Sequence, residues 1–415
     1  MKKIDLAVIG GGSAGMAAAL SAYAQGIRNI LIFERSPSLG GVLRQCIHTG
    51  FGLHRFHEDL TGTEYAKREV DAIRKAGIAF MTDTTVLEIG ENRSITAVNT
   101  GGLVRYEAGA VVLAMGCRER SRGALLIPGS RPAGILSAGT AQRYMNLEGF
   151  RVGTGMVILG SGDIGLIMAR QFTLEGAAVH AVAEIMPYSN GLTRNLVQCL
   201  EDFNIPIFYN TTVTRVEGRE RLSAVTLAEV DERRRPLPGT ERKISCDTLV
   251  LSVGLIPENE LTLAAGIPLS ETSGGALVED SLQTGKEGVF ACGNALHVND
   301  LVDFVSLEGE RAGISAARHI RGEAPEGPLY RVREGPGVRG LVPQFIRGKG
   351  RETGEKILLR FRPAARFEKC RISLRSGEKI IATRNCPIIT PGEICEIPVD
   401  RNRIRGDLTL EVVRA

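Results

Sequence analysis

The chain has 415 residues, of which 43% are hydrophobic and 24% charged, and this length and composition are typical of a soluble globular protein of two or three domains. No apolar run approaches the length needed to span a bilayer, which excludes an integral membrane protein. The eight cysteines show neither C-x-x-C pairs nor zinc-like spacing, which disfavours a metal site and suits a reduced, cytoplasmic location.

The chain opens with the pattern of a strand, a glycine-rich turn, a helix and a second strand. In a G-x-G-x-x-G turn, the first glycine permits the tight turn, the second lets the backbone approach a pyrophosphate, and the third lets helix and strand pack closely. The helix N-terminus offers N–H groups to phosphates, and an acidic residue that ends the second strand can bind ribose hydroxyls. The predicted elements are strand Ile4–Ile9, the glycines Gly10, Gly12 and Gly15, helix Ser13–Gln25, strand Asn29–Phe33 and the acidic Glu34.

The same pattern returns 150 residues further along the chain. Every landmark of the first unit has a counterpart in this register, so two individually weak signals support each other. The sequence therefore predicts two dinucleotide-binding units. The second comprises strand Met156–Leu159, the glycines Gly160, Gly162 and Gly165, a helix that ends at Gly176, strand Val179–Ala183 and Glu184.

Further elements follow each unit. After the first, we predict a helix near Gly62–Ala76, short antiparallel strands at Thr84–Ile89, Ile95–Thr100 and Leu103–Tyr106, and a buried strand at Ala110–Met115. After the second, we predict a helix at Leu192–Asp202, strands at Pro206–Tyr209, Asp247–Val253 and Val289–Ala291, and a helix at about Ser306–Ile320.

The last part of the chain differs in pattern and in charge. Residues Glu323–Gly340 are rich in Pro, Gly and Arg and are interpreted as a linker. From Lys356 the apolar residues alternate, which predicts a small β-sandwich. Residues 331–415 hold 19 Lys/Arg and 10 Asp/Glu, a balance of +9, whereas the rest of the chain has a balance of −5. We expect a separable domain that docks an acidic partner or simply presents a solvated face. Nucleic-acid binding is disfavoured because aromatic residues are sparse.

Taken together, these motifs resemble the two-dinucleotide-binding-domain flavoproteins of the pyridine nucleotide–disulfide oxidoreductase superfamily. Three further stretches, Ala114–Arg118, Leu251–Pro257 and Gly288–Asn294, resemble the two crossover segments and the second FAD motif of that family. The resemblance implies an α/β fold with two Rossmann-like domains, the second inserted in the first, plus a small C-terminal all-β sandwich. It places an FAD-binding domain at 1–117 and 250–325, an NAD(H)-binding domain at 118–249 and a C-terminal β domain at 331–415.

The resemblance also implies which residues contact the cofactors FAD and NADH. One departure is that the second FAD motif ends in Asn294 where the family has Asp, although an Asn carbonyl can still accept a hydrogen bond from a ribityl hydroxyl. The FAD-site residues are Gly10, Gly12, Ser13, Ala14, Gly15, Glu34, Arg35, Gly41, Val86, Ala114, Gly116, Gly293 and Asn294, and the NADH-site residues are Gly160, Gly162, Asp163, Ile164, Gly165, Glu184 and Gly254.

The cysteines point away from a thiol–disulfide relay. Disulfide reductases of the family carry a C-x-x-x-x-C or C-x-x-C pair, whereas the first of these locations holds a single cysteine, Cys46, here. Cys46 is a candidate redox thiol or a packed cysteine under the flavin. The histidines at 48, 54, 57 and 297 are candidates to line the flavin pocket or are ordinary hydrogen bonders.

A closer resemblance lies in Gly40–Gly52 together with Gly293–His297. These stretches are similar to the flavoprotein subunits that accompany glycerol-3-phosphate dehydrogenase-type enzymes, and to subunits of opine and proline dehydrogenases and hydrogen cyanide synthase. We therefore expect an FAD-dependent NADH oxidoreductase that exchanges electrons with a glycerol-3-phosphate dehydrogenase-like partner or a small acceptor. The alternatives are a single-cysteine NADH oxidase or disulfide reductase using Cys46, and a flavin-binding docking or sensor subunit of low turnover. A homo-oligomer is left open.

Overall fold

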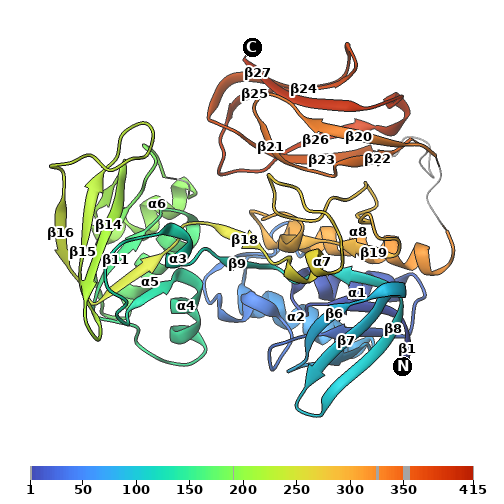
Figure 1. The fold of residues 1–415 in the computed structure, drawn as a ribbon, viewed down its shortest axis with the longest axis horizontal. Helices are drawn as coiled ribbons and strands as arrows, with labels where there is room; N and C mark the ends of the chain where they lie inside the picture. The colour runs from blue at the N-terminus through green and yellow to red at the C-terminus, as the bar shows by residue number, and fades with distance from the viewer. Residues whose placement is uncertain (1, 190, 324–326, 349–355, 415) are drawn as a thin grey trace. The chain divides into compact units, whose positions relative to one another are not determined.

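The computed structural model describes residues 2–189, 191–323, 327–348 and 356–414 (Figure 1). The chain divides into two compact units, one formed by Met1–Cys117 with Pro257–Ala415 and the other by Arg118–Ile256. The second unit interrupts the first, which agrees with the predicted insertion of one Rossmann-like domain into another. Two short strands, β9 (Cys117–Glu119) and β18 (Leu255–Pro257), pair where the chain passes from one unit to the other.

A seven-stranded sheet organises the first unit, with the order β5-β2-β1-β8-β7-β6 and with β19 paired to β8. Its central strands are parallel and apolar, as expected for strands that helices cover on both faces. The strands are β1 (Lys2–Ile9), β2 (Ile30–Phe33), β5 (Ala79–Met81), β6 (Thr85–Ile89), β7 (Ser94–Asn99), β8 (Gly102–Leu113) and β19 (Val289–Ala291). The predicted strands Leu103–Tyr106 and Ala110–Met115 are parts of the single strand β8, because Gly109 lies against the Asp5 backbone without breaking the pairing.

Two helices of this unit, α1 (Ser13–Ala24) and α8 (Val302–Ile320), cross at very short range. A side chain at Gly309 would collide with the Ala14 carbonyl, and one at Gly313 with the Ala18 carbonyl. The alanines of α1 and the glycines of α8 therefore permit a contact that larger residues would prevent. The unit also contains α2 (Gly62–Lys75), α7 (Glu260–Ala264) and the strands β3 (Thr49–Phe51) and β4 (Leu60–Thr61).

The second unit repeats the parallel architecture on a smaller scale. Its five-stranded sheet has the order β10-β17-β11-β12-β13, and a three-stranded antiparallel sheet, β14-β15-β16, follows it. The predicted helix Leu192–Asp202 is shorter than expected, since α6 ends at Cys199 and a 3-10 turn follows. The elements are β10 (Ile135–Ser137), β11 (Gly155–Leu159), β12 (Ala178–Ala183), β13 (Ile207–Phe208), β14 (Thr211–Gly218), β15 (Leu222–Glu229), β16 (Arg242–Ser245), β17 (Thr248–Leu251), α3 (Arg122–Leu125), α4 (Ala138–Asn146), α5 (Asp163–Leu174) and α6 (Thr193–Cys199).

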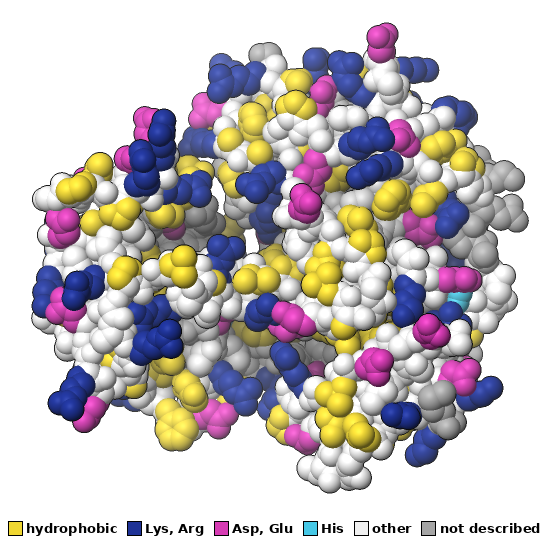
Figure 2. Space-filling view, viewed as in Figure 1, with side chains coloured by type: hydrophobic (Ala, Val, Ile, Leu, Met, Phe, Trp, Pro, Cys, Tyr) yellow, Lys and Arg dark blue, Asp and Glu magenta, His cyan; other side chains and the backbone are white. Residues whose placement is uncertain are grey.

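The C-terminal strands form two sheets, β22-β20-β27-β24-β25 and β21-β23-β26, around a hydrophobic core of their own. On the face shown in Figure 2, Lys and Arg side chains are frequent over these strands. The linker interpretation of Glu323–Gly340 is wrong where β20 and most of β21 lie, and residues 324–326 of that stretch lie outside the described residues. The strands are β20 (Leu329–Glu334), β21 (Val338–Val342), β22 (Phe345–Arg347), β23 (Lys356–Pro363), β24 (Phe367–Ser376), β25 (Lys379–Ile389), β26 (Cys395–Asp400) and β27 (Leu408–Arg414).

This β domain is in close contact with the rest of the first unit. Val342 belongs to the core of the seven-stranded sheet, and the Gln344 side chain accepts a hydrogen bond from the Val278 amide at 2.9 Å. Arg347 pairs with Glu279 at 2.7 Å. These contacts join the β domain to the rest of the first unit, and the separability that the sequence predicts stays a prediction.

Candidate functional site

The first glycine turn connects β1 to α1 and packs against the end of the neighbouring strand β8. Gly10 follows β1 with φ +106°, and a side chain on it would collide with the Ala114 carbonyl at the end of β8. A side chain on Gly15 would collide with the Gly10 carbonyl. Both positions therefore require glycine, as the sequence pattern predicts.

The start of α1 has open backbone groups for a phosphate. Gly12 is the N-cap residue, no side chain caps the helix, and its first turn has no acidic residue. Gly41 lies directly opposite, since an added Cβ there would be 3.0 Å from the Gly12 Cα. A cradle lined by two glycines beside a helix N-terminus fits the pyrophosphate of a dinucleotide.

Glu34 lies where the motif predicts an acceptor for ribose hydroxyls. Its buried carboxylate accepts hydrogen bonds from the Gly11 amide at 2.8 Å and the Ser36 amide at 2.7 Å. Each oxygen retains a further lone pair, so the carboxylate is held in place and can still accept from a ligand. Arg35 beside it is exposed.

The second FAD motif reaches the same place from the other end of the chain. Gly293 lies against the start of α1, because an added Cβ there would be 2.7 Å from the Ala14 Cβ. Asn294 accepts a hydrogen bond from the Asn299 amide at 2.9 Å and donates to the Cys117 Sγ at 3.5 Å. The fold thus gathers most of the predicted FAD-site residues at the carboxyl ends of the parallel strands. Val86, by contrast, lies in β6 at the end of the sheet, where it packs on the domain core.

The second unit contains an equivalent turn. Gly160 has φ +98°, and a side chain on it would collide with the Ser252 carbonyl after β17. Glu184 is buried, and its carboxylate accepts from the Ser161 amide and hydroxyl at 2.9 and 2.6 Å and from the Met186 amide at 2.9 Å.

The helix of this second turn, α5, begins at Asp163 and has no side-chain cap. The Asp163 carboxylate accepts hydrogen bonds from the Leu192 amide and the Asn195 side chain, at 2.8 and 2.7 Å. The Asp163 carboxylate is thereby held by the start of α6. Ile164 and Gly165 follow within α5, and Gly254 lies beyond β17 with φ +101°.

Cys46 does not lie in an activating environment. The thiol is buried, its Sγ is 3.5 Å from the Val42 carbonyl, and burial raises its pKa to about 12. A reactive thiol needs the opposite shift, because the thiolate is the nucleophile. None of the eight cysteines, all of which lie among the described residues, forms a disulfide.

Two buried carboxylates in helices make contacts that no sequence motif predicts. Burial raises the pKa of Glu69 in α2 to about 7, opposed by the charge of Arg55 and a hydrogen bond from Ser306 at 3.0 Å. Glu308 in α8 accepts from His297 at 2.9 Å. The sequence does contain one sign that Glu308 is buried. It lies four residues after Phe304 and four before Ala312, which places an acidic residue on the apolar face of the helix.

The structure also limits other kinds of site. Across the described residues, no group of His, Cys, Asp and Glu has an arrangement that could hold a metal ion. Within those same ranges, no helix combines the length and apolar character of a membrane span.

Comparison with known proteins agrees with this architecture. The pyridine nucleotide-disulphide oxidoreductase family model matches residues 4–320. One of the opine oxidase subunits of Agrobacterium tumefaciens is 25% identical over 76% of this chain and 66% of its own length. Thioredoxin reductase of Treponema pallidum is 25% identical over 76% of this chain and 97% of its own length. The crystal structure of T. acidophilum thioredoxin reductase superimposes with a TM-score of 0.64 at 23% identity, covering 76% of this chain and 98% of the other.

These matches confirm the expected superfamily and fold, and the structure shows a β-rich C-terminal region beyond the family match. This chain spans slightly under two thirds of the opine oxidase protein, so the activity of that whole protein does not transfer with the match. The family match covers both glycine turns and the Gly293-Asn294 motif, and members of this family are flavin-dependent oxidoreductases that generally use NAD(P)H. The chain belongs to the pyridine nucleotide-disulphide oxidoreductase family.

Proposed function

We propose that this chain is an FAD-dependent NADH oxidoreductase that moves electrons between NADH, flavin and a partner dehydrogenase or small acceptor, without a redox disulfide. The observation that carries the proposal is the repeated environment of Glu34 and Glu184. Each is a buried carboxylate held by the amides of its own glycine turn and of the loop that follows its strand. Two such carboxylates indicate two dinucleotides whose adenosine riboses carry free hydroxyls.

The residues of the chain supply binding and orientation. Gly12 and Gly41 would line the FAD pyrophosphate, Glu34 would accept from its ribose, and Asn294 would face the ribityl chain. The turn that begins at Gly160 and Glu184 would hold NADH in the same way. When bound, FAD supplies the hydride and electron chemistry that these side chains cannot perform themselves.

The environment of Cys46 supports a function without a thiol relay. A buried thiol with a pKa of about 12 is a poor nucleophile at neutral pH, which counts against an oxidase or disulfide reductase that uses it. A partner is supported by the opine oxidase relative, because that protein is one of the subunits of its enzyme. The excess of Lys and Arg in residues 331–415 favours an acidic docking surface on that partner.

The test is a steady-state assay of the purified protein with NADH and a dye acceptor, after its flavin content has been measured. We expect bound FAD and dye reduction that depends on it. Pull-down from the native source would then supply candidate partners, each assayed as electron donor or acceptor. A protein that is purified without flavin and does not take up added FAD would contradict the proposal.

A further inference from the structure

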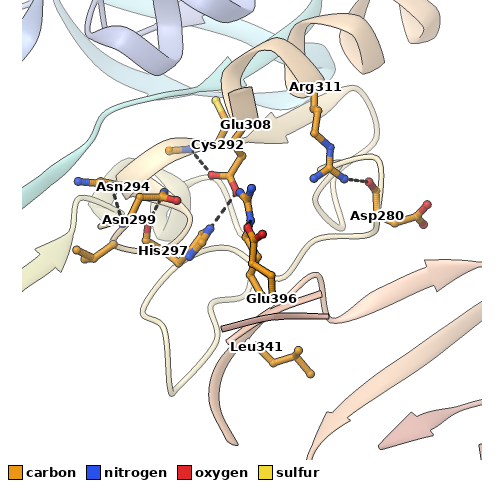
Figure 3. Close-up of polar contacts among 12 residues, drawn as sticks. Asp280, Cys292, Asn294, His297, Asn299, Glu308, Arg311, Leu341 and Glu396 are labelled. Carbon is orange, nitrogen blue, oxygen red and sulfur yellow. Dashed lines mark hydrogen bonds and ion pairs between the residues drawn. The ribbon is translucent and has the colours of Figure 1, made fainter. Parts of the chain in front are cut away.

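A buried ion-pair network connects the C-terminal β domain to the second FAD motif (Figure 3). Its centre is Glu308 on α8, which is 2% exposed. One carboxylate oxygen accepts from the Gly293 amide at 2.7 Å. The other accepts from His297 Nε2 at 2.9 Å and from Arg360 Nη1 at 3.3 Å.

The charge on Glu308 depends on these partners. Burial opposes ionisation, but His297 and Arg360, together with the Gly293 amide, outweigh it and hold the pKa of Glu308 below its usual value. A buried carboxylate without such partners is strongly destabilising. Glu308 therefore remains charged and attached to all three groups.

Arg360 comes from β23 and joins two carboxylates with one planar group. Its Nε donates to Glu396 of β26 at 2.8 Å, while its Nη1 donates to Glu308. The guanidinium also lies over the Phe304 ring, 5.7 Å from the ring centroid. A lysine could supply the charge, but its single ammonium group lacks the separate, planar N–H donors that reach both carboxylates.

The loop held by Glu308 contains the residue that would face the flavin. Gly293 is tightly confined, since an added Cβ would be 2.7 Å from the Ala14 Cβ and 3.2 Å from the Val305 Cγ1. Asn294 follows directly, and Asn299 closes the loop by bonding both Asn294 and the His297 carbonyl. Fixing Gly293 and His297 therefore fixes Asn294 between them.

We propose that Arg360 is a positioning residue for FAD: through Glu308 it sets the backbone of Gly293 and the His297 ring, so that the β domain completes the flavin site. The inference rests on the proposed function. An ordered loop binds its ligand more tightly because less freedom is lost on binding. A cation close to the flavin also favours the reduced, more negatively charged form of the cofactor.

The test compares Arg360→Gln and Arg360→Lys with Arg366→Gln and Arg366→Lys. Arg366 lies in the same domain and pairs with Glu368 at 2.8 Å on the surface, where such pairs contribute little. For each full-length protein we would measure the FAD dissociation constant, the flavin midpoint potential and the thermal midpoint of the apoprotein.

We expect Arg360→Gln to weaken FAD binding by about tenfold or more and to shift the flavin potential to a more negative value. Arg360→Lys should restore the flavin potential but recover FAD binding only partly, because the positive charge returns without donors that reach both Glu308 and Glu396. If Arg360→Gln does not fold, the FAD dissociation constants of Arg360→Lys and Arg366→Lys are compared instead, and only the first variant should bind FAD more weakly than wild type. FAD affinity and potential in the Arg360 variants equal to those of the Arg366 controls would overturn the inference. Wild-type protein that fails to bind FAD would instead contradict the proposed function.

Discussion

Glu34 and Glu184 make the same set of backbone contacts in two separate units. Each donates its own amide to a strand further along the chain, Glu34 to Met81 and Glu184 to Phe208, both at 2.8 Å. Each carboxylate accepts from the second residue of the preceding glycine turn and from the residue two positions after itself. The two acids therefore face their turns in equivalent ways, and the same ligand group is expected at both.

Glu184 is expected to make NADH the preferred nucleotide. The 2′-phosphate of NADPH would lie against this carboxylate, and two charges about 4 Å apart repel by up to about 4 kcal/mol at an effective dielectric of 20. Allowing for screening, we expect about 2 kcal/mol, or roughly thirtyfold in kcat/KM. A nearby cation could bind the 2′-phosphate and offset this repulsion. The guanidinium of Arg221, however, donates a hydrogen bond to the Thr248 hydroxyl at 3.0 Å.

The measurement is kcat/KM for both nucleotides with a dye acceptor, in wild type, Glu184→Ala and Glu184→Gln. Glu184→Gln serves as the matched variant, because it removes the charge and keeps an acceptor for Ser161. Both variants should lower the preference for NADH. A wild type that uses both nucleotides equally, or variants with an unchanged ratio, would show that Glu184 does not set the choice.

Gly15→Ala is expected to disrupt the first glycine turn, where we propose that FAD binds. The added methyl group would collide with the Gly10 carbonyl, and overpacking of this kind costs about 1–3 kcal/mol. We expect a lower thermal midpoint and less bound flavin than in wild type. Gly285→Ala is the control, because no atom lies within 4 Å of its added Cβ. Equal flavin content in the two variants would argue against a close-packed turn.

Cys46→Ser is expected to leave NADH-to-dye electron transfer within about a factor of two of wild type, because a buried thiol of raised pKa is not a nucleophile. Cys246→Ser is the control, since burial also raises the pKa of that thiol, to about 11. Turnover that falls by about a hundredfold in Cys46→Ser alone, with flavin still bound, would make Cys46 catalytic.

Glu69 is expected to make the protein less stable as the pH rises from about 4.5 to about 7. Its pKa is raised to about 7, so the folded protein holds a proton that the unfolded chain releases above about 4.5. The stabilisation by the neutral acid is complete below the unfolded pKa and is lost as the pH passes through the folded one. The difference in the free energy of unfolding amounts to at most about 3.5 kcal/mol.

Glu69→Gln should therefore raise the thermal midpoint relative to wild type at pH 8 and have little effect at pH 5. The other groups in this network are Arg55, Tyr65, Asp303 and Glu310. Because these groups surround residue 69 in both proteins, the informative quantity is the difference in thermal midpoint between the variant and wild type at each pH. A difference that is the same at pH 5 and pH 8 would contradict the raised pKa.

The sequence determined most of the architecture of the candidate cofactor sites. The turns at Gly10 and Gly160 could be predicted because glycine spacing, strand and helix are encoded locally. The 150-residue repeat predicted a second dinucleotide-binding unit, and the family resemblance implied that it is inserted in the first. Glu34 and Glu184 followed from the same local geometry. The small β-sandwich was predicted from its alternating apolar residues, which also report on local structure.

Only the tertiary structure decided what the C-terminal domain contacts and how the buried acids are paired. Glu308 and Arg360 are 52 residues apart in the sequence and lie in different elements, so no local pattern could join them. The linker interpretation of Glu323–Gly340 was wrong because Pro and Gly content reports on backbone preference, whereas strand pairing with distant segments decides whether such residues form a sheet. The raised pKa values of Glu69 and Cys46 could not be predicted from the sequence either. Burial causes both shifts, and burial depends on every element that packs around a side chain, which no single segment specifies.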